Sequence, residues 1–187
     1  VKNLEARAFL INASTRGEVD LGVIRVLKAK NALLVADAQG FLRVIAPDGT
    51  LVHAPWPEKE QVLSQIDILK ADAVEAEMLT GEADLCAAAR TISGWGPKEI
   101  VLTHASGVLV LAAGQFHEAQ FRPRELVGRS GRGDTCIAAY VARRLAASPP
   151  EATLWAAAVT SLKLEAEGPL RRTREEVEDL LARMYRA

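Results

Sequence analysis

The chain has 187 residues, of which 49% are apolar and 25% charged, and its formal net charge is −1. This length and composition suit a globular protein with a sizeable core, and the scattered, balanced charges argue against a nucleic-acid-binding surface. The sequence shows no apolar run long enough to span a bilayer and no secretory signal. We therefore expect a single cytoplasmic domain over residues 1–187, with neither nucleic acid nor membrane as a partner.

The N-terminal part predicts a strand, a helix and a second strand. Residues 8–12 and 32–37 are continuous apolar runs, and residues 19–27 between them place apolar side chains at helical spacing. Continuous rather than alternating apolar strands are typical of a parallel sheet covered on both faces, so we expect a βαβ crossover. Asp37 closes the second strand, either near a ligand site, as in open α/β sheets, or merely at the start of a turn.

The next stretch predicts a hairpin, a short helix and a third buried strand. Residues 41–45 and 50–53 are β-prone runs separated by a Pro-Asp-Gly turn. A short helix should begin at Glu58, and residues 66–70 form another apolar strand-like run.

A one-sided helix is expected after this strand, marked by Val74, Met78 and Leu79 and ended by Gly81. Asp72 and Glu75 precede or open it, near the carboxyl end of the strand. Acidic side chains in that place could hold a magnesium ion through water. The simpler alternative is an ordinary acidic N-cap turn.

Residues 100–103 predict a strand, which a turn at 104–107 joins to a second run at 108–112 and to a third beyond it. We expect these strands to be sequential and partly antiparallel. His104, in the turn, has no Cys or second His at ligand spacing, so it suits a turn or pocket histidine better than a metal ligand.

A glycine-rich stretch at 127–135, Val-Gly-Arg-Ser-Gly-Arg-Gly-Asp-Thr, opens the apolar helical run 136–147. A helix start offers N–H groups without intrahelical partners and the positive end of the dipole, and glycines let a phosphate approach closely. Asp134 would lie in the first turn, ionised and able to accept a proton from a hydroxyl. Alternatively, Asp134 only caps the helix, or Arg132, Gly133 and Asp134 form an adhesion tripeptide, which the following helix disfavours.

Three further helices are predicted at 85–94, 154–162 and 177–184 from their one-sided apolar patterns. Thr173 and Glu176 form a capping box before the last of them. The sequence shows no internal repeat and no domain linker, so the chain is expected to be one α/β unit that ends in helices.

In this order, the motifs resemble those of the ribokinase-like (PfkB-type) carbohydrate kinases over nearly the whole chain. Residues 130–135 are similar to the family's Thr-Gly-Ala-Gly-Asp signature. The resemblance implies that the backbone of Gly131, Arg132 and Gly133 forms the anion hole and that Asp134 is the catalytic base.

Residues 69–81 are similar to the family's strand-to-helix Asn-x-x-Glu element, which implies that Glu75 helps to place magnesium and phosphate. The implied fold is α/β, with three layers and a mostly parallel sheet covered by helices on both faces. The implied cofactors are ATP and Mg²⁺. The implied nucleotide site comprises the phosphate-facing turn, an acidic residue and two segments that flank the adenine: Thr103, His104, Ser106, Gly107, Asp72, 116–123 and 154–164.

The chain departs from the family pattern at three places. In the glycine loop, Gly128 stands where the family has an Asp that helps to bind a monovalent cation, and Arg132 replaces an Ala. In the strand-to-helix element, Asp72 replaces the Asn. The strand-turn element at 103–107, Thr-His-Ala-Ser-Gly, is one residue short and lacks the usual first glycine. We therefore expect activity to depend little on potassium, with the glycine loop held by local packing or by Arg132. The runs at 37–43 and 69–76 look like those of a branch that includes inositol-kinase-like members.

Family members are normally longer, and their sugar-binding motif and β-lid lie in an N-terminal part without a counterpart here. We expect this chain to expose an apolar patch and to associate with itself or with a missing N-terminal part.

Two functions of different class follow. The first is an ATP-dependent kinase that phosphorylates a hydroxyl of a small sugar or polyol, and the second is a non-catalytic nucleotide-binding or structural remnant of such a kinase. A Rossmann dehydrogenase is a distant third, because no Gly-x-Gly-x-x-Gly follows the first strand.

Overall fold

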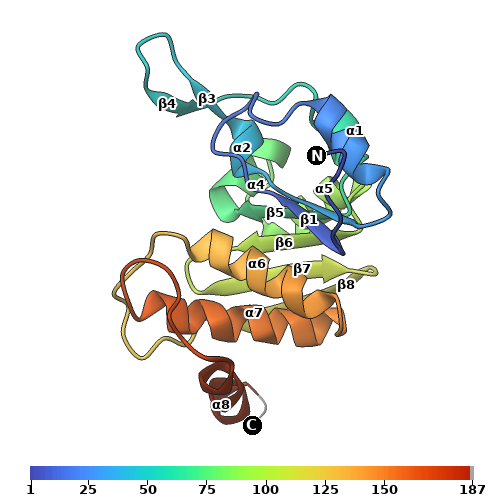
Figure 1. Ribbon diagram of the computed structural model, residues 1–187. Helices are drawn as coiled ribbons and strands as arrows, with labels where there is room; N and C mark the ends of the chain where they lie inside the picture. Colours follow the sequence, from blue (N-terminus) through green and yellow to red (C-terminus); the bar gives the residue numbers. More distant parts are fainter. Residues whose placement is uncertain (186–187) are drawn as a thin grey trace. The chain divides into compact units, whose positions relative to one another are not determined.

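The computed structural model describes residues 1–185, and in it the chain divides into two compact units (Figure 1). Unit 1 comprises residues 1–102 with 111–114, and unit 2 comprises residues 103–110 with the chain from 115 onwards. The strands are β1 (Ala8–Ile11), β2 (Leu33–Asp37), β3 (Arg43–Ile45), β4 (Leu51–His53), β5 (Ile68–Asp72), β6 (Glu99–Thr103), β7 (Gly107–Ala112) and β8 (Gln115–Gln120). The helices are α1 (Leu21–Lys28), α2 (Gln39–Leu42), α3 (Lys59–Leu63), α4 (Ala73–Thr80), α5 (Leu85–Gly94), α6 (Arg132–Arg144), α7 (Pro149–Leu164) and α8 (Arg174–Met184).

The strands of unit 1 lie side by side in the order β1, β2, β5, β6. β1 pairs in parallel with β2, and β2 pairs in parallel with β5. The core residues of these strands, such as Leu34, Val35 and Leu69, are fully buried. Parallel pairing and full burial confirm the predicted βαβ crossover, in which continuous apolar strands are buried on both faces of the sheet.

The hairpin prediction is confirmed for the turn and corrected for its first strand. β3 and β4 pair antiparallel, but Phe41 and Leu42 belong to helix α2 rather than to a strand. The amides of both residues donate to the Ala38 carbonyl, and the Phe41 ring stacks on Trp56 with 4.5 Å between centroids. Burial of this aromatic pair therefore outweighs the β propensity of the run.

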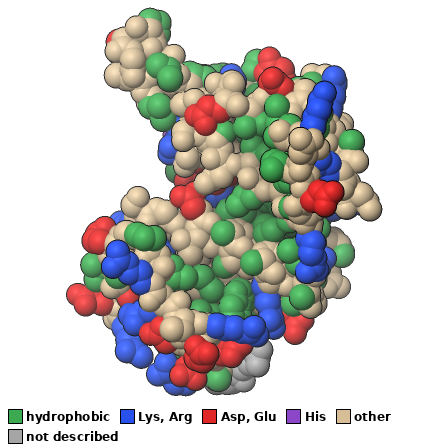
Figure 2. Space-filling view, in the orientation of Figure 1, with side chains coloured by type: hydrophobic (Ala, Val, Ile, Leu, Met, Phe, Trp, Pro, Cys, Tyr) green, Lys and Arg blue, Asp and Glu red, His purple; other side chains and the backbone are tan. Residues whose placement is uncertain are grey.

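The β3–β4 hairpin carries exposed apolar side chains, which Figure 2 shows in green. Ile45 is 65% exposed, and Leu51 and Val52 are also exposed. β1 adds a partly exposed Leu10. These exposed apolar side chains lie mostly on the hairpin, so a contiguous apolar patch over the first strand stays a prediction.

Helix α4 has a different buried face from the predicted one. Val74 and Met78 are 61% and 43% exposed, whereas Glu75, Ala76 and Leu79 are buried. The reason is electrostatic: Glu75 turns inward because it accepts the Asp72 amide and lies near a buried ammonium group. The predicted end at Gly81, in the left-handed conformation, is confirmed.

Unit 2 contains β8 and the helices α6, α7 and α8, with most of β7. α6 and α7 pack against each other along their lengths (Figure 1), and nearly all of α7 from Ala152 onwards is buried. The capping box of Thr173 and Glu176 before α8 is confirmed. Val177 and Leu181 on α8 are buried, as predicted, but Met184 in its last turn is exposed.

The chain thus has the predicted α/β fold, a mixed and mostly parallel sheet combined with helices. Within residues 1–185, we find no helix of the length and apolar character that a membrane crossing requires.

Candidate active site

The glycine-rich loop of unit 2 opens α6, as the sequence predicts. Gly131 is the N-cap residue, with a left-handed φ of 75°, and it contributes no side-chain cap to the first turn. The left-handed conformation is one that glycine adopts without a steric penalty. The N–H groups of the first turn have no side-chain cap from Gly131, and they lie with the positive end of the dipole of a 13-residue helix at the glycine loop.

Asp134 lies in the first turn of α6, and its side chain is exposed. An ideal Cβ built on Gly131 would lie 3.9 Å from Asp134 Oδ2 and 3.8 Å from the Cε of Lys163. The candidate base, the helix N-cap and a lysine that the sequence did not single out are therefore neighbours within unit 2.

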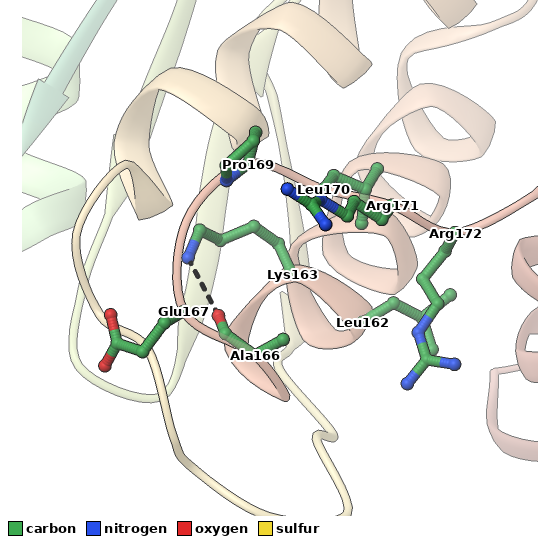
Figure 3. A pocket seen from close by; sticks show the side chains of 8 residues that line it. All are labelled: Leu162, Lys163, Ala166, Glu167, Pro169, Leu170, Arg171 and Arg172. Carbon is green, nitrogen blue, oxygen red and sulfur yellow. Dashed lines mark hydrogen bonds between the residues drawn. The ribbon is translucent and has the colours of Figure 1, made fainter.

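Lys163 contacts the loop that precedes α6. Its Nζ donates to the carbonyl oxygens of Gly128, at 3.3 Å, and of Ala166, at 3.4 Å. Figure 3 shows the second of these bonds beside a cavity of about 360 Å³ whose rim carries two arginines, Arg171 and Arg172. The loop thus rests on the C-terminal end of α7.

The turn at 104–107 lies in the same unit and is coupled to the glycine loop through charge. Burial lowers the pKa of His104; the nearby Glu118 carboxylate opposes this, and the charge of Arg132 adds to the lowering. His104 Nδ1 and Ser106 Oγ are 3.3 Å apart. His104 is therefore a part-buried turn histidine within electrostatic range of Arg132.

The backbone of this turn is tightly packed. A side chain at Gly107 would place its Cβ 2.5 Å from the Ala119 carbonyl oxygen, so only glycine fits. Thr103 is buried, with no hydrogen bond to its hydroxyl among residues 1–185, whereas Ser106 is exposed. Of the predicted phosphate-facing residues, Ser106 and the part-buried His104 offer side chains at the surface.

The two segments expected to flank an adenine lie next to each other in unit 2. The Arg122 amide donates to Ser161 Oγ at 2.8 Å. The Tyr185 hydroxyl lies 3.0 Å from Ser161 Oγ and donates to the Gln120 carbonyl at 2.7 Å. A polar network therefore connects the end of β8 to the C-terminal part of α7.

Unit 1 contains the predicted acidic group, and the structure adds a lysine at its centre. Asp37 is the register partner of Lys70 across the parallel strands β2 and β5. Lys70 Nζ lies 3.0 Å from Asp37 Oδ2 and 3.5 Å from Glu75 Oε2. All three side chains are buried. Asp37 also accepts the Gln39 amide, so it starts a turn and neutralises a charge.

Asp72 and Glu75 form a complete capping box at the start of α4. Asp72 Oδ1 accepts the Glu75 amide at 2.8 Å, and Glu75 Oε2 accepts the Asp72 amide at 2.7 Å. The simpler sequence interpretation, an acidic N-cap turn, is therefore present in the structure.

Burial and ion pairing act in opposite directions in this cluster. Burial raises the pKa of Glu75, and the Lys70 charge only partly offsets it. Burial by itself would lower the pKa of Lys70, but the charges of Asp37 and Glu75 outweigh it and the pKa is raised. The lysine is therefore held in its ammonium form.

A magnesium ion fits this cluster only through water and phosphate. No group of three or more His, Cys, Asp or Glu side chains within residues 1–185 is arranged to hold a metal. Glu75 is engaged by Lys70 and by the Asp72 amide. Because Mg²⁺ in phosphotransferases often uses one or two carboxylates, waters and substrate phosphates, a role of Glu75 in magnesium binding stays a prediction.

Comparison with known proteins decides the family. The model of the pfkB family of carbohydrate kinases matches residues 24–174, which include both the acidic cluster and the glycine loop. The chain belongs to this family. The PfkB chain is also similar to a cytidine kinase from Thermococcus kodakarensis, with 32% identity over 85 residues, 44% of this chain and 31% of the relative.

Solved structures of kinases match this PfkB chain over most of its length. A pyrophosphate-dependent kinase of the ribokinase family, solved with a pyrophosphate analog and myo-inositol, is 46% identical with a TM-score of 0.87. The match covers 95% of this chain and 64% of that one. A ribokinase from Arabidopsis thaliana with ribose and ATP has 24% identity and a TM-score of 0.70, covering 85% and 50%. The chain thus spans less than two thirds of the length of these relatives.

Sequence reasoning missed the two lysines. Lys70 ends the apolar run at 66–70, and Lys163 is the one charged residue of α7 between Glu151 and the end of the helix. A charged residue inside an otherwise apolar element is the signal that could have identified both, because a buried charge requires partners.

Proposed function

We propose that this chain carries the phosphoryl-transfer machinery of a kinase that phosphorylates a hydroxyl group of a small polyol or sugar. The observation that carries the proposal is the position of Asp134, in the first turn of a helix that Gly131 opens without a side-chain cap. In a PfkB-family chain, this arrangement pairs an acceptor of protons with a seat for anions.

The chemistry follows from these two parts. Asp134 accepts the proton of the substrate hydroxyl while the oxygen of that hydroxyl forms a bond to the transferring phosphorus. The bond from that phosphorus to the bridging oxygen of the donor breaks, and the shortened donor leaves with the electron pair. Backbone N–H groups of Gly131, Arg132 and Gly133 and the dipole of α6 stabilise the charge on the transferring group.

The donor we favour is pyrophosphate, with ATP as the alternative that the family resemblance implies. The relative at 46% identity is named as pyrophosphate-dependent, whereas the ribokinase solved with ATP is only 24% identical. The cationic side chain of Arg132, in place of the family's alanine, supports a small and highly charged donor.

Glu75 is the residue we assign to magnesium, which it would hold through water. When bound, the ion supplies charge neutralisation to the phosphate oxygens. Lys70 keeps the buried Glu75 carboxylate in place.

The acceptor we favour is a cyclic polyol of the inositol type. The 46% identical structure contains myo-inositol, and a cytidine kinase is the relative at 32% identity, which makes nucleosides the second class to test.

A donor and acceptor screen tests the proposal on the natural polypeptide that carries these 187 residues. Pyrophosphate and ATP would each be combined with myo-inositol, ribose and cytidine, and phosphorylated products followed by ³¹P NMR. We expect product from pyrophosphate and myo-inositol. Product from ATP alone would reassign the donor, and binding of a nucleotide without any product would favour the non-catalytic remnant.

A further inference from the structure

Within residues 1–185, the ammonium group of Lys163 is a buried cation that donates only to neutral backbone oxygens. Lys163 is 3% exposed and lies in the last turn of α7. Its ammonium group donates to the carbonyls of Gly128 and Ala166 (Figure 3 shows the second). A lysine near a helix C-terminus commonly caps the last carbonyls, which explains the bond to Ala166. It does not explain the bond to Gly128, which is 35 residues away in the sequence.

The bond to Gly128 belongs to a larger junction between the glycine loop and α7. The amides of Val127 and Gly128 both donate to the Leu164 carbonyl, at 2.9 and 3.1 Å. A Cβ at Gly128 would lie 2.3 Å from the Ala166 carbonyl oxygen, so the two backbones approach too closely for any side chain. Glycine at 128 is therefore required by packing, in addition to leaving no carboxylate at this point.

The Lys163 side chain then continues from this junction to the start of α6. Its Cε lies 3.8 Å from an ideal Cβ on Gly131, the N-cap residue. The lysine thus spans the base of the loop from Gly128 to Gly131, whose neighbours provide the anion hole of the proposed function.

We propose that the Lys163 ammonium is a built-in cation of the glycine loop. It positions the loop through carbonyl oxygens, as a bound monovalent ion would, and places a positive charge next to the anion hole of the proposed function. Two consequences follow: the protein needs no added monovalent cation, and removal of the side chain leaves a space that a small cation can fill. Lys163 is a positioning residue, and its catalytic consequence rests on the proposed function.

The first test compares the wild type with Lys163→Ala in buffers of potassium, ammonium or the bulky tetramethylammonium. Thermal unfolding and inorganic pyrophosphate binding are measured, since neither needs turnover. We expect the wild type to be indifferent to the cation. In tetramethylammonium, the variant should unfold earlier and bind pyrophosphate about ten- to a hundredfold more weakly, the scale of a lost charged hydrogen bond, and potassium or ammonium should restore both.

A second variant, Lys163→Met, keeps the test decisive if the alanine variant does not fold. It fills the same volume without charge, so it should fold, bind pyrophosphate weakly and show no rescue by any cation. Lys59→Met is the matched control, because Lys59 also donates to a backbone carbonyl, that of Leu79, but lies in unit 1.

The outcomes separate this inference from the proposed function. A wild type that requires potassium, an alanine variant whose unfolding no cation changes, or a methionine variant that binds pyrophosphate normally would each overturn the role of Lys163. An absence of kinase activity together with rescue of unfolding would contradict the proposed function and leave the built-in cation standing.

Discussion

Two buried lysines, one in each unit, are held in opposite ways. Lys70 lies between the carboxylates of Asp37 and Glu75, so its charge is compensated by side chains. Lys163 donates to the carbonyls of Gly128 and Ala166, which are dipoles without net charge. The comparison teaches that a buried lysine neutralises two carboxylates in unit 1, whereas in unit 2 the same side chain contributes a net positive potential.

The difference has a consequence for ligands. The charge of an ammonium ion between two carboxylates is neutralised, so the ion attracts a phosphate weakly. An ammonium ion held by neutral carbonyls keeps a net positive charge, which adds to the positive end of the α6 dipole. We therefore place the anion seat in unit 2, at the start of α6, and regard the cluster of unit 1 first as a structural element.

The largest effect is expected from Asp134→Asn, which removes the base and leaves the loop intact. Phosphoryl transfer should fall by about 10²–10⁴-fold, the usual contribution of general base catalysis, while the donor still binds. Steady-state rates and pyrophosphate titration measure the two quantities. Asp179→Asn, which changes an exposed aspartate on α8, is the matched control, and equal rates for the two variants would move the base elsewhere.

Lys70→Met removes the cation that pairs with two buried carboxylates in unit 1. It leaves the carboxylates of Asp37 and Glu75 buried without their cation, which should lower the free energy of unfolding by about 3–5 kcal/mol. Denaturant unfolding followed by circular dichroism measures this loss. Lys163→Met should cost less, because its partners are neutral, and a larger loss for Lys163→Met would reverse the comparison.

Gly131→Ala isolates the backbone conformation of the loop. Gly131 and Gly114 have nearly the same left-handed φ, 75° and 76°, and neither has an atom closer than 3.8 Å to an added Cβ. Alanine at either place should cost about 1–2 kcal/mol of stability, from the left-handed conformation alone. Only Gly131→Ala should also weaken pyrophosphate binding in a calorimetric titration. Equal binding by both variants would show that the loop backbone does not contact the donor.

The smallest effect concerns His104. Its pKa is lowered by burial and by the charge of Arg132, so stability falls as the pH drops from the ordinary value of 6.5 through the lowered value. Arg132→Met should raise the pKa of His104 and reduce that loss. NMR titration of the imidazole measures the pKa of His104 in each variant, with Arg124→Met as the control. An unchanged pKa of His104 in the Arg132→Met variant would mean that Arg132 points away from the turn.

Much of the fold could be predicted from the sequence because periodicity and caps are local signals. The continuous apolar strands, the left-handed Gly81 and the capping box at Thr173 all have the predicted roles. Phe41 and Val74 were misplaced because their burial depends on distant partners, Trp56 for the first and the inward turn of Glu75 for the second.

The site was predictable to a similar extent. The glycine loop and Asp134 form a contiguous motif, so their position at the start of α6 could be read directly. The roles of Lys70 and Lys163 depend on contacts with residues more than 30 positions away, Asp37 and Gly128. Such contacts become visible only in three dimensions.

The most direct test of the anion seat is a titration of the ¹⁵N-labelled protein with inorganic pyrophosphate. If the start of α6 binds the donor, the backbone amides of Gly131, Gly133 and Asp134 should show the largest shift changes, with smaller changes at Ser106 and Gly107. Changes concentrated instead at Arg171 and Arg172, beside the cavity at the end of α7, or around Lys70 in unit 1, would contradict the account.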